Sequence, residues 1–91
     1  MTSTADTELI WEFPCHFPIK AMGRNVPDLD GIIVEIVRRH VDDLHEGAVT
    51  TKESKGGKFI SVTVNIEAQS KAQLDAIYTD INACPHVVMS L

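Results

Sequence analysis

The sequence predicts an α+β fold with the element order βαββαβ. One stretch alternates apolar and polar residues, as a half-buried strand does. The apolar face of that strand is Ile60, Val62, Val64 and Ile66. Two stretches, 27–40 and one that begins at Ser70, place apolar residues at helical i, i+3, i+4, i+7 spacing. Both helices can be buried only on one face of an antiparallel sheet, which predicts a ferredoxin-like two-layer sandwich with spatial strand order 4-1-3-2.

The first predicted strand is recognised by its prolines and by its alternation. Pro14 and Pro18 favour extended chain, and the strand is expected to end at Gly23. Lys20 and Met22 alternate with the apolar residues of this strand, so we expect them on the face away from the core.

The first predicted helix runs from Pro27 to His40. Pro27 suits a first helical turn, and basic residues at the end of the stretch match the helix dipole. The apolar stripe of this helix is Val26, Leu29, Ile32, Ile33, Ile36 and Val37.

The second half of the chain supplies the remaining elements. The weakly apolar stretch from Ala48 to Ser54 predicts an edge strand, and Lys-Gly-Gly-Lys at 55–58 predicts a hairpin turn. Ser70 has capping-box spacing to a glutamine and opens the second helix. Pro85 ends that helix, and the last strand is predicted over Val87 to Leu91.

Length and composition predict a single domain. With 91 residues the chain can build one core, and we expect residues 1–10 to form a frayed tail before a domain over 11–91. No apolar run is long enough to cross a bilayer, and the start of the chain resembles neither a signal nor a transit peptide. The two cysteines fit a reducing compartment, so we expect a cytoplasmic protein with no membrane partner.

The Cys and His residues suggest a metal site that the predicted topology excludes. Cys15-His16 and Cys84-Pro85-His86 lie at opposite ends of a sheet about 20 Å long. A disulfide requires Cα atoms within about 7 Å. No nucleophile lies in a recognisable elbow or beside a base. The sequence therefore predicts no metal, no cofactor and no catalytic residue, and hence a protein that is not an enzyme.

The sheet face without helices is the first candidate interaction surface. The residues expected there are Lys20, Met22, Phe59, Ser61, Thr63 and Asn65. This mixture is too polar for a core and too apolar for an idle surface. Our leading hypothesis is a non-enzymatic regulatory or adaptor domain, in which the open face or an edge strand pairs with another protein or a second copy of the chain.

Basic residues at one end of the sheet form a second candidate site. The topology gathers Arg24, Asn25, Lys55, Lys58 and His86 there. The first helix also points its N-terminus in this direction, so a carboxylate or phosphate could bind. The alternative is that the Lys-Gly-Gly-Lys turn is simply a solvated hairpin tip.

Two other function classes share the predicted topology. Residues 55–62 resemble the third-strand signature of the RNA-recognition motif, but only Phe59 fills one of its three aromatic positions. The net charge of −5 also disfavours nucleic acid. An acylphosphatase-like enzyme would use Arg24 with an Asn on the second strand, and Ala48 to Ser54 contains no Asn.

An ordered set of residues from Leu9 to Leu91 resembles the small bacterial YbeD family. The set is Glu12-Phe13-Pro14, Phe17, Lys20, Met22-Gly23, Arg39-His40, Ser54-Lys55-Gly56, Phe59, Ser61 and Val62. The resemblance implies a cytoplasmic protein of uncharacterised function with a fold like that of the ACT regulatory domain. Because the family's genes often lie near those of lipoate synthesis, it also implies a regulatory role in that pathway, with a metabolic enzyme as partner.

Overall fold

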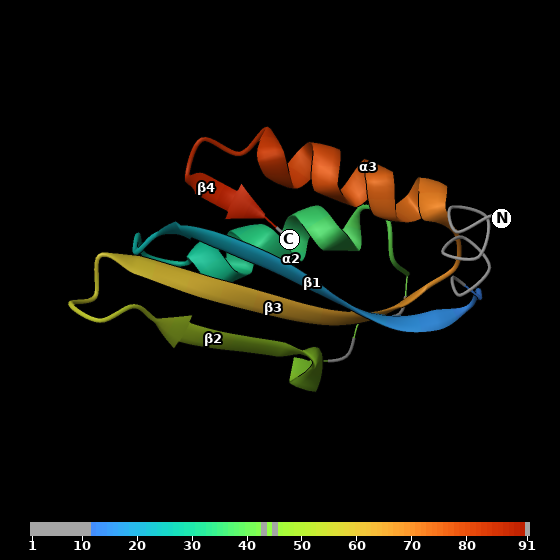
Figure 1. Cartoon of the computed structure of the whole chain (residues 1–91), viewed down its shortest axis with the longest axis horizontal. Helices are drawn as coiled ribbons and strands as arrows, with labels where there is room; N and C mark the ends of the chain where they lie inside the picture. Colours follow the sequence, from blue (N-terminus) through green and yellow to red (C-terminus); the bar gives the residue numbers. More distant parts are fainter. Residues whose placement is uncertain (1–11, 43, 45, 91) are drawn as a thin grey trace, which may run out of the picture.

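A computed structural model describes residues 12–42, 44 and 46–90 of the chain (Figure 1). The expected tail, residues 1–10, lies outside the described residues, as does Leu91 of the predicted last strand. The elements are β1 (Cys15–Arg24), α2 (Leu29–Arg38), the 3-10 turn η1 (Glu46–Ala48), β2 (Val49–Glu53), β3 (Phe59–Ala68), α3 (Lys71–Asn82) and β4 (Val87–Ser90).

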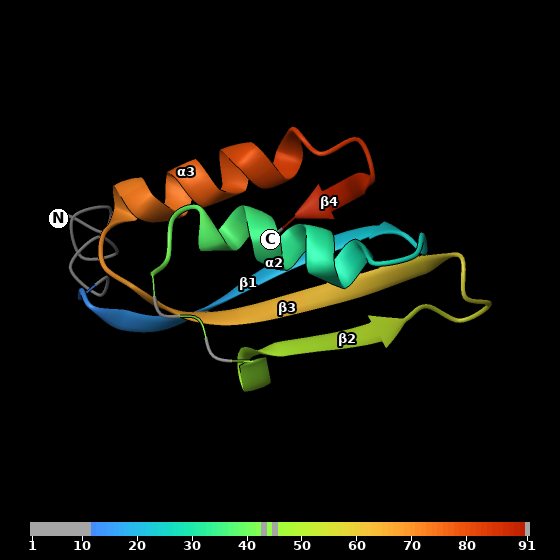
Figure 2. The ribbon, with the colours of Figure 1, turned by 180° about the vertical axis from the view of Figure 1, so that it is seen from behind.

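The four strands form one antiparallel sheet in the order β2-β3-β1-β4, which confirms the predicted fold class and strand order. β1 and β3 pair along their whole length, from Cys15 opposite Ala68 to Arg24 opposite Phe59. Figure 2 shows α2 in front of the strands, whereas in Figure 1 the strands lie in front of α2. Residues of both helices are buried with the same face of the sheet, so its reverse face carries no helix.

The core lies between this sheet and the two helices. The largest fully buried side chains are Ile19, Leu29, Ile33, Val37, Val62, Val64, Ile77 and Ile81. Of the alternating row on β3, three members are buried and Ile60 is only partly buried, near the hairpin. The alternation that predicted the sheet therefore does mark its buried face.

The first helix is shorter than predicted. It begins at Leu29 instead of Pro27 and ends at Arg38 instead of His40. The physical reason at its start is Asp28, whose φ of 63° is left-handed and incompatible with a helical turn. The second helix begins as predicted, because the Ser70 hydroxyl accepts a hydrogen bond from the backbone N–H of Gln73 at 3.1 Å.

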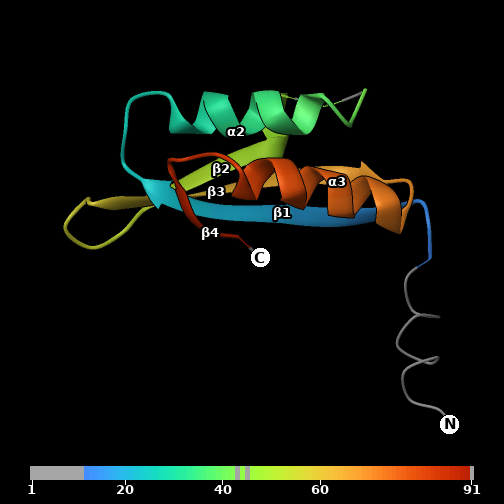
Figure 3. The same ribbon diagram turned by 90° about the horizontal axis from the view of Figure 1, so that it is seen from above.

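The loops gather at the two ends of the sheet as the topology predicts (Figure 3). At the hairpin end the backbone N–H of Arg24 donates to the carbonyl of His86, and that of Asn25 donates to Lys58, each at 3.0 Å. At the other end the Gln73 side chain donates to the carbonyl of His40 at 2.7 Å. Each end therefore joins segments that are distant in the sequence.

Candidate functional site

The strand register defines the sheet face that the helices leave open. Residues directly opposite each other in an antiparallel pair share a face. The open face accordingly carries His16, Pro18, Lys20, Met22 and Arg24 of β1, Phe59, Ser61, Thr63, Asn65 and Glu67 of β3, Thr50 and Lys52 of β2, and Met89 of β4. The six residues that the sequence assigns to an interaction surface thus lie together, and their role stays a prediction.

A shallow apolar hollow lies near the middle of this open face. Its volume is about 100 Å³, and its lining includes Met22, Met89 and Thr63. Lys20 also lines it, and because nearly all of the lining surface is apolar, Lys20 contributes mainly the carbon chain of its side chain. Sequence reasoning did not include Met89, because its place opposite Met22 depends on the register of β4.

The two edge strands differ in how they meet solvent. β2 carries two charged residues, Lys52 and Glu53, both exposed. β4 carries no charge, and its Val88 and Met89 are 50 % and 52 % exposed. Charges on an edge strand oppose pairing with another strand, whereas an uncharged apolar edge invites it. Of the two edges, β4 is therefore the one without charged residues.

The part of β1 that β4 does not reach is closed by other means. β4 pairs only with Ala21 to Gly23. The backbone N–H of Arg24 donates to His86, on the β4 side of β1. Every second residue of a strand points its nitrogen to the same side, so the nitrogen of Pro18 also faces this side, and proline has no N–H to donate.

Burial raises the pKa of Tyr78, and a hydrogen bond from the backbone of Lys20 opposes this shift. The Tyr78 hydroxyl therefore lies at the backbone of Lys20 on β1.

The cationic end of the sheet is held together by its backbone and by one amide. The Asn25 side chain donates to the carbonyl of Gly57 at 2.9 Å, which ties the loop after β1 to the hairpin. Gly56 and Gly57 adopt positive φ angles of 94° and 75°, as the turn requires. The five candidate anion ligands occupy this end; Arg24, Asn25, Lys55 and Lys58 are exposed and His86 is half-buried. Their role as ligands stays a prediction.

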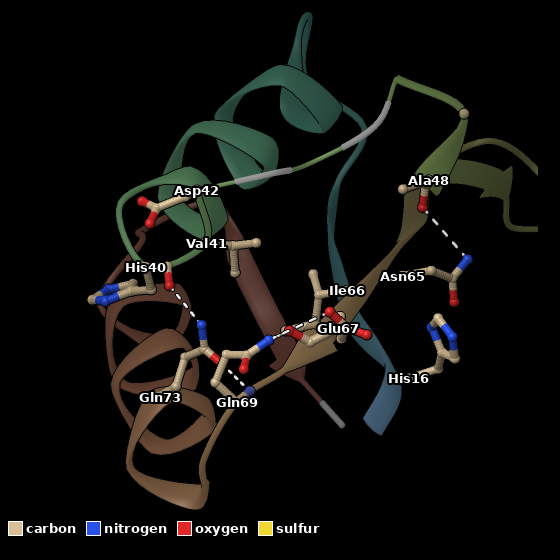
Figure 4. Close-up of a pocket in the computed structure, with 11 residues that line it drawn as sticks. His16, His40, Val41, Asp42, Ala48, Asn65, Ile66, Glu67, Gln69 and Gln73 are labelled. Atoms are coloured by element: carbon tan, nitrogen blue, oxygen red, sulfur yellow. Dashed lines mark hydrogen bonds between the residues drawn. The ribbon is translucent and has the colours of Figure 1, made fainter. Parts of the chain in front are cut away.

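A larger hollow of about 600 Å³ lies at the opposite end of the sheet (Figure 4). It opens between β3, the end of α2 and the start of α3, and its lining includes His16, His40, Asp42, Glu67 and Gln73. Sequence reasoning did not propose it as a site. The predicted topology brings these loops to one end of the sheet, and this was the one feature of the sequence that could have indicated the hollow.

Several polar groups around this hollow are engaged in holding the fold. The Gln73 side chain donates to His40 and accepts from the Gln69 N–H at 2.7 Å. His40 Nε2 lies 2.7 Å from a carboxylate oxygen of Asp80, which links α2 to α3. The Asn65 amide donates to the carbonyl of Ala48 at 3.4 Å. The hydrogen bonds around this hollow therefore join segments that are distant in the sequence.

The described residues give no support to metal binding. Within 12–42, 44 and 46–90, no group of three or more His, Cys, Asp or Glu side chains could hold an ion. Cys15 and Cys84 are both free thiols, and Cys15 pairs with Ala68 at the end away from the hairpin. Neither helix in this part of the chain is long and apolar enough to cross a membrane.

Comparisons with known proteins place the chain among proteins without an established function. Residues 8–91 match the model of a family described as "Protein of unknown function (DUF493)". A UPF0250 protein of Chromobacterium violaceum is 44 % identical over 82 residues, covering 90 % of this chain and 92 % of its own length. One of Paraburkholderia phytofirmans is 39 % identical over 84 residues, covering 92 % and 94 %.

A solved structure supports the fold independently. The solution structure of protein HP0495 from H. pylori matches with a TM-score of 0.68 at 19 % identity, over 88 % of this chain and 84 % of that one. The names of these relatives specify no reaction. The chain therefore belongs to the DUF493 family, whose members include the UPF0250 proteins and which is the YbeD family that the sequence resembles.

Proposed function

We propose that this chain is a non-catalytic binding domain that associates with a second copy through the outer edge of β4. The observation that carries the proposal is the contrast between the two edges of the sheet. β4 exposes Val88 and Met89 without a charged residue, and β2 exposes Lys52 and Glu53. An uncharged apolar edge is the feature that sheet proteins otherwise avoid.

Pairing of β4 with β4 of a second copy satisfies the geometry of a symmetric dimer. A two-fold axis perpendicular to the sheet makes the two strands antiparallel and presents the same residues from each copy. Two four-stranded sheets then continue as one, and the helices of both copies lie on the same side. With neither Lys nor Asp nor Glu on β4, no like charges oppose each other.

A regulatory or adaptor role fits such a domain. Two copies joined edge to edge present two open faces in one plane, which strengthens binding to a partner that carries two matching surfaces. The resemblance to the YbeD family supports a metabolic enzyme as that partner, with lipoate metabolism as the pathway. The uncharacterised relatives are compatible with this role.

The dimer is tested by placing a charge on each edge in turn. Val88→Lys is expected to raise the dissociation constant of the dimer at least tenfold, because each of the two paired β4 strands would then carry an ammonium group and the like charges would repel each other. Thr51→Lys adds the same charge to the exposed β2 strand and is the matched control, which should leave the constant unchanged. Sedimentation equilibrium over a wide range of concentrations measures both.

Two outcomes contradict the proposal. One is a strict monomer at the highest concentration of the unsubstituted chain. The other is a dimer that Thr51→Lys weakens as much as Val88→Lys does. Circular dichroism of both variants checks that each remains folded.

A small anionic effector at the cationic end is a second candidate function. The observation that favours it is the pair of bonds from Asn25 to the hairpin, at 3.0 Å from its N–H and 2.9 Å from its amide. These bonds keep Arg24 and the lysines at one end. Inorganic phosphate and lipoate are expected to raise the melting temperature, and Lys58→Glu should remove that increase. Equal melting with and without these anions would exclude the site.

A further inference from the structure

We infer that the open face of the sheet binds an acidic segment of a partner protein, with one aliphatic side chain of that segment seated in the hollow between Met22 and Met89. The inference rests on the proposal that the chain is a binding domain, but not on the dimer. It names the chemistry of the partner that the open face accepts.

The distribution of charge between the two layers is the first argument. The open face carries Lys20, Arg24 and Lys52, and its one acidic residue, Glu67, lies at the far end opposite His16. The helices carry four acidic and two basic residues. The whole chain has a net charge of −5, so the open face differs in sign from the molecule. Such a face attracts an acidic partner in preference to a basic one.

The hollow supplies the second argument. Its volume of about 100 Å³ equals that of roughly three water molecules, which suits a single aliphatic side chain. Met22 and Met89 lie opposite each other across the β1–β4 pair, and methionine adapts its shape to varied apolar groups. Thr63 and Ser61 also line the hollow, and both residues lie on the open face.

The position of the cations relative to the hollow is the third argument. Lys20 lines the hollow directly. Lys52 lies opposite Ser61, another lining residue, and Arg24 follows Met22 by two positions on the same face. A segment with acidic residues on both sides of an aliphatic one therefore meets a cation on each side. Charged groups around an apolar anchor give an interface its orientation.

Single-stranded RNA fits this face less well. Binding of bases requires aromatic platforms. Among the described residues of this face, Phe59 is the one Phe, Tyr or Trp side chain; it is half-buried and opposite Arg24, while His16 lies at the far end of the sheet. The hollow is too small for a base and is lined by methionine. Acidic peptide is thus the occupant that both the charge and the shape favour.

The test uses the full chain and a ten-residue synthetic peptide with a central leucine between aspartates and glutamates. Titration followed by ¹H–¹⁵N NMR is expected to shift amides of β1, β3 and β4 around the hollow. Lys20→Glu should weaken binding at least tenfold. Lys71→Glu makes the same charge change on α3, where Lys71 is exposed, and should change affinity less than twofold.

Control peptides and a control variant separate this inference from the dimer. A peptide with lysines in place of the acidic residues, and one with glycine in place of leucine, should each bind at least tenfold more weakly. Val88→Lys should retain peptide binding, because Val88 does not line the hollow. Lys20→Glu should retain self-association. Equal binding of the acidic and basic peptides, tighter binding of oligouridylate at the same amides, or shifts confined to the helices would overturn the inference.

Discussion

Val64→Asp is expected to leave the chain without a cooperative unfolding transition. Val64 is fully buried between the sheet and the helices, so an aspartate there would be an unpaired charge in the core. Such a change costs about 4–5 kcal/mol or more, which is comparable with the whole stability of a small domain. Far-UV circular dichroism and amide dispersion in NMR spectra measure the loss.

Thr63→Asp is the matched control on the neighbouring residue of the same strand. Thr63 faces the open side, directly opposite Lys20, so an aspartate there gains an opposite charge across the strands. We expect a folded domain whose stability changes by less than about 1 kcal/mol. If both variants fold, or if both unfold, the assignment of the two faces of β3 is wrong.

Gly23→Ala is expected to destabilise the domain by about 2–4 kcal/mol. A Cβ at Gly23 would lie 2.5 Å from the carbonyl oxygen of His86 and 2.8 Å from a methyl of Leu29. The carbonyl accepts the hydrogen bond from Arg24, so it cannot retreat without loosening the end of the sheet. Urea denaturation monitored by circular dichroism gives the difference in unfolding free energy.

Gly31→Ala provides a control with the opposite sign. Gly31 lies inside α2, and a Cβ there would meet nothing within 4 Å. Replacing an exposed helical glycine by alanine stabilises a helix by about 0.5–1 kcal/mol. The two substitutions add the same methyl group, so only its surroundings separate their effects. A Gly23→Ala chain as stable as the Gly31→Ala chain would contradict the close packing of β1 against the loop before β4.

The parts of the fold that periodic patterns specify could be predicted from the sequence. Val62, Val64 and Ile66 alternate with polar residues, and this alternation gives both the strand and its buried face. The start of α2 could not be predicted, because the apolar periodicity of the sequence does not indicate the left-handed backbone conformation of Asp28. Pro27 is compatible with either helix or turn, so it gave the wrong start.

The candidate site was predicted only in part for a similar reason. Residues of β1 and β3 on the open face follow from alternation within each strand. Met89 joins them only through the pairing of β4 with β1. The register of this pairing shifts between Met22 and Gly23 of β1. The hollow at the other end depends on long-range bonds such as that from Gln73 to His40. Contacts between distant segments of this kind leave little local signature in a sequence.

In the proposed dimer the β4 edges of two copies pair with each other. The most direct measurement is an isotope-filtered NOE experiment on an equal mixture of labelled and unlabelled chain at high concentration. Contacts between copies are expected from Val88 and Met89 of one β4 to β4 of the other. Contacts confined to β2 or to the helices, or an absence of contacts between copies, would contradict it.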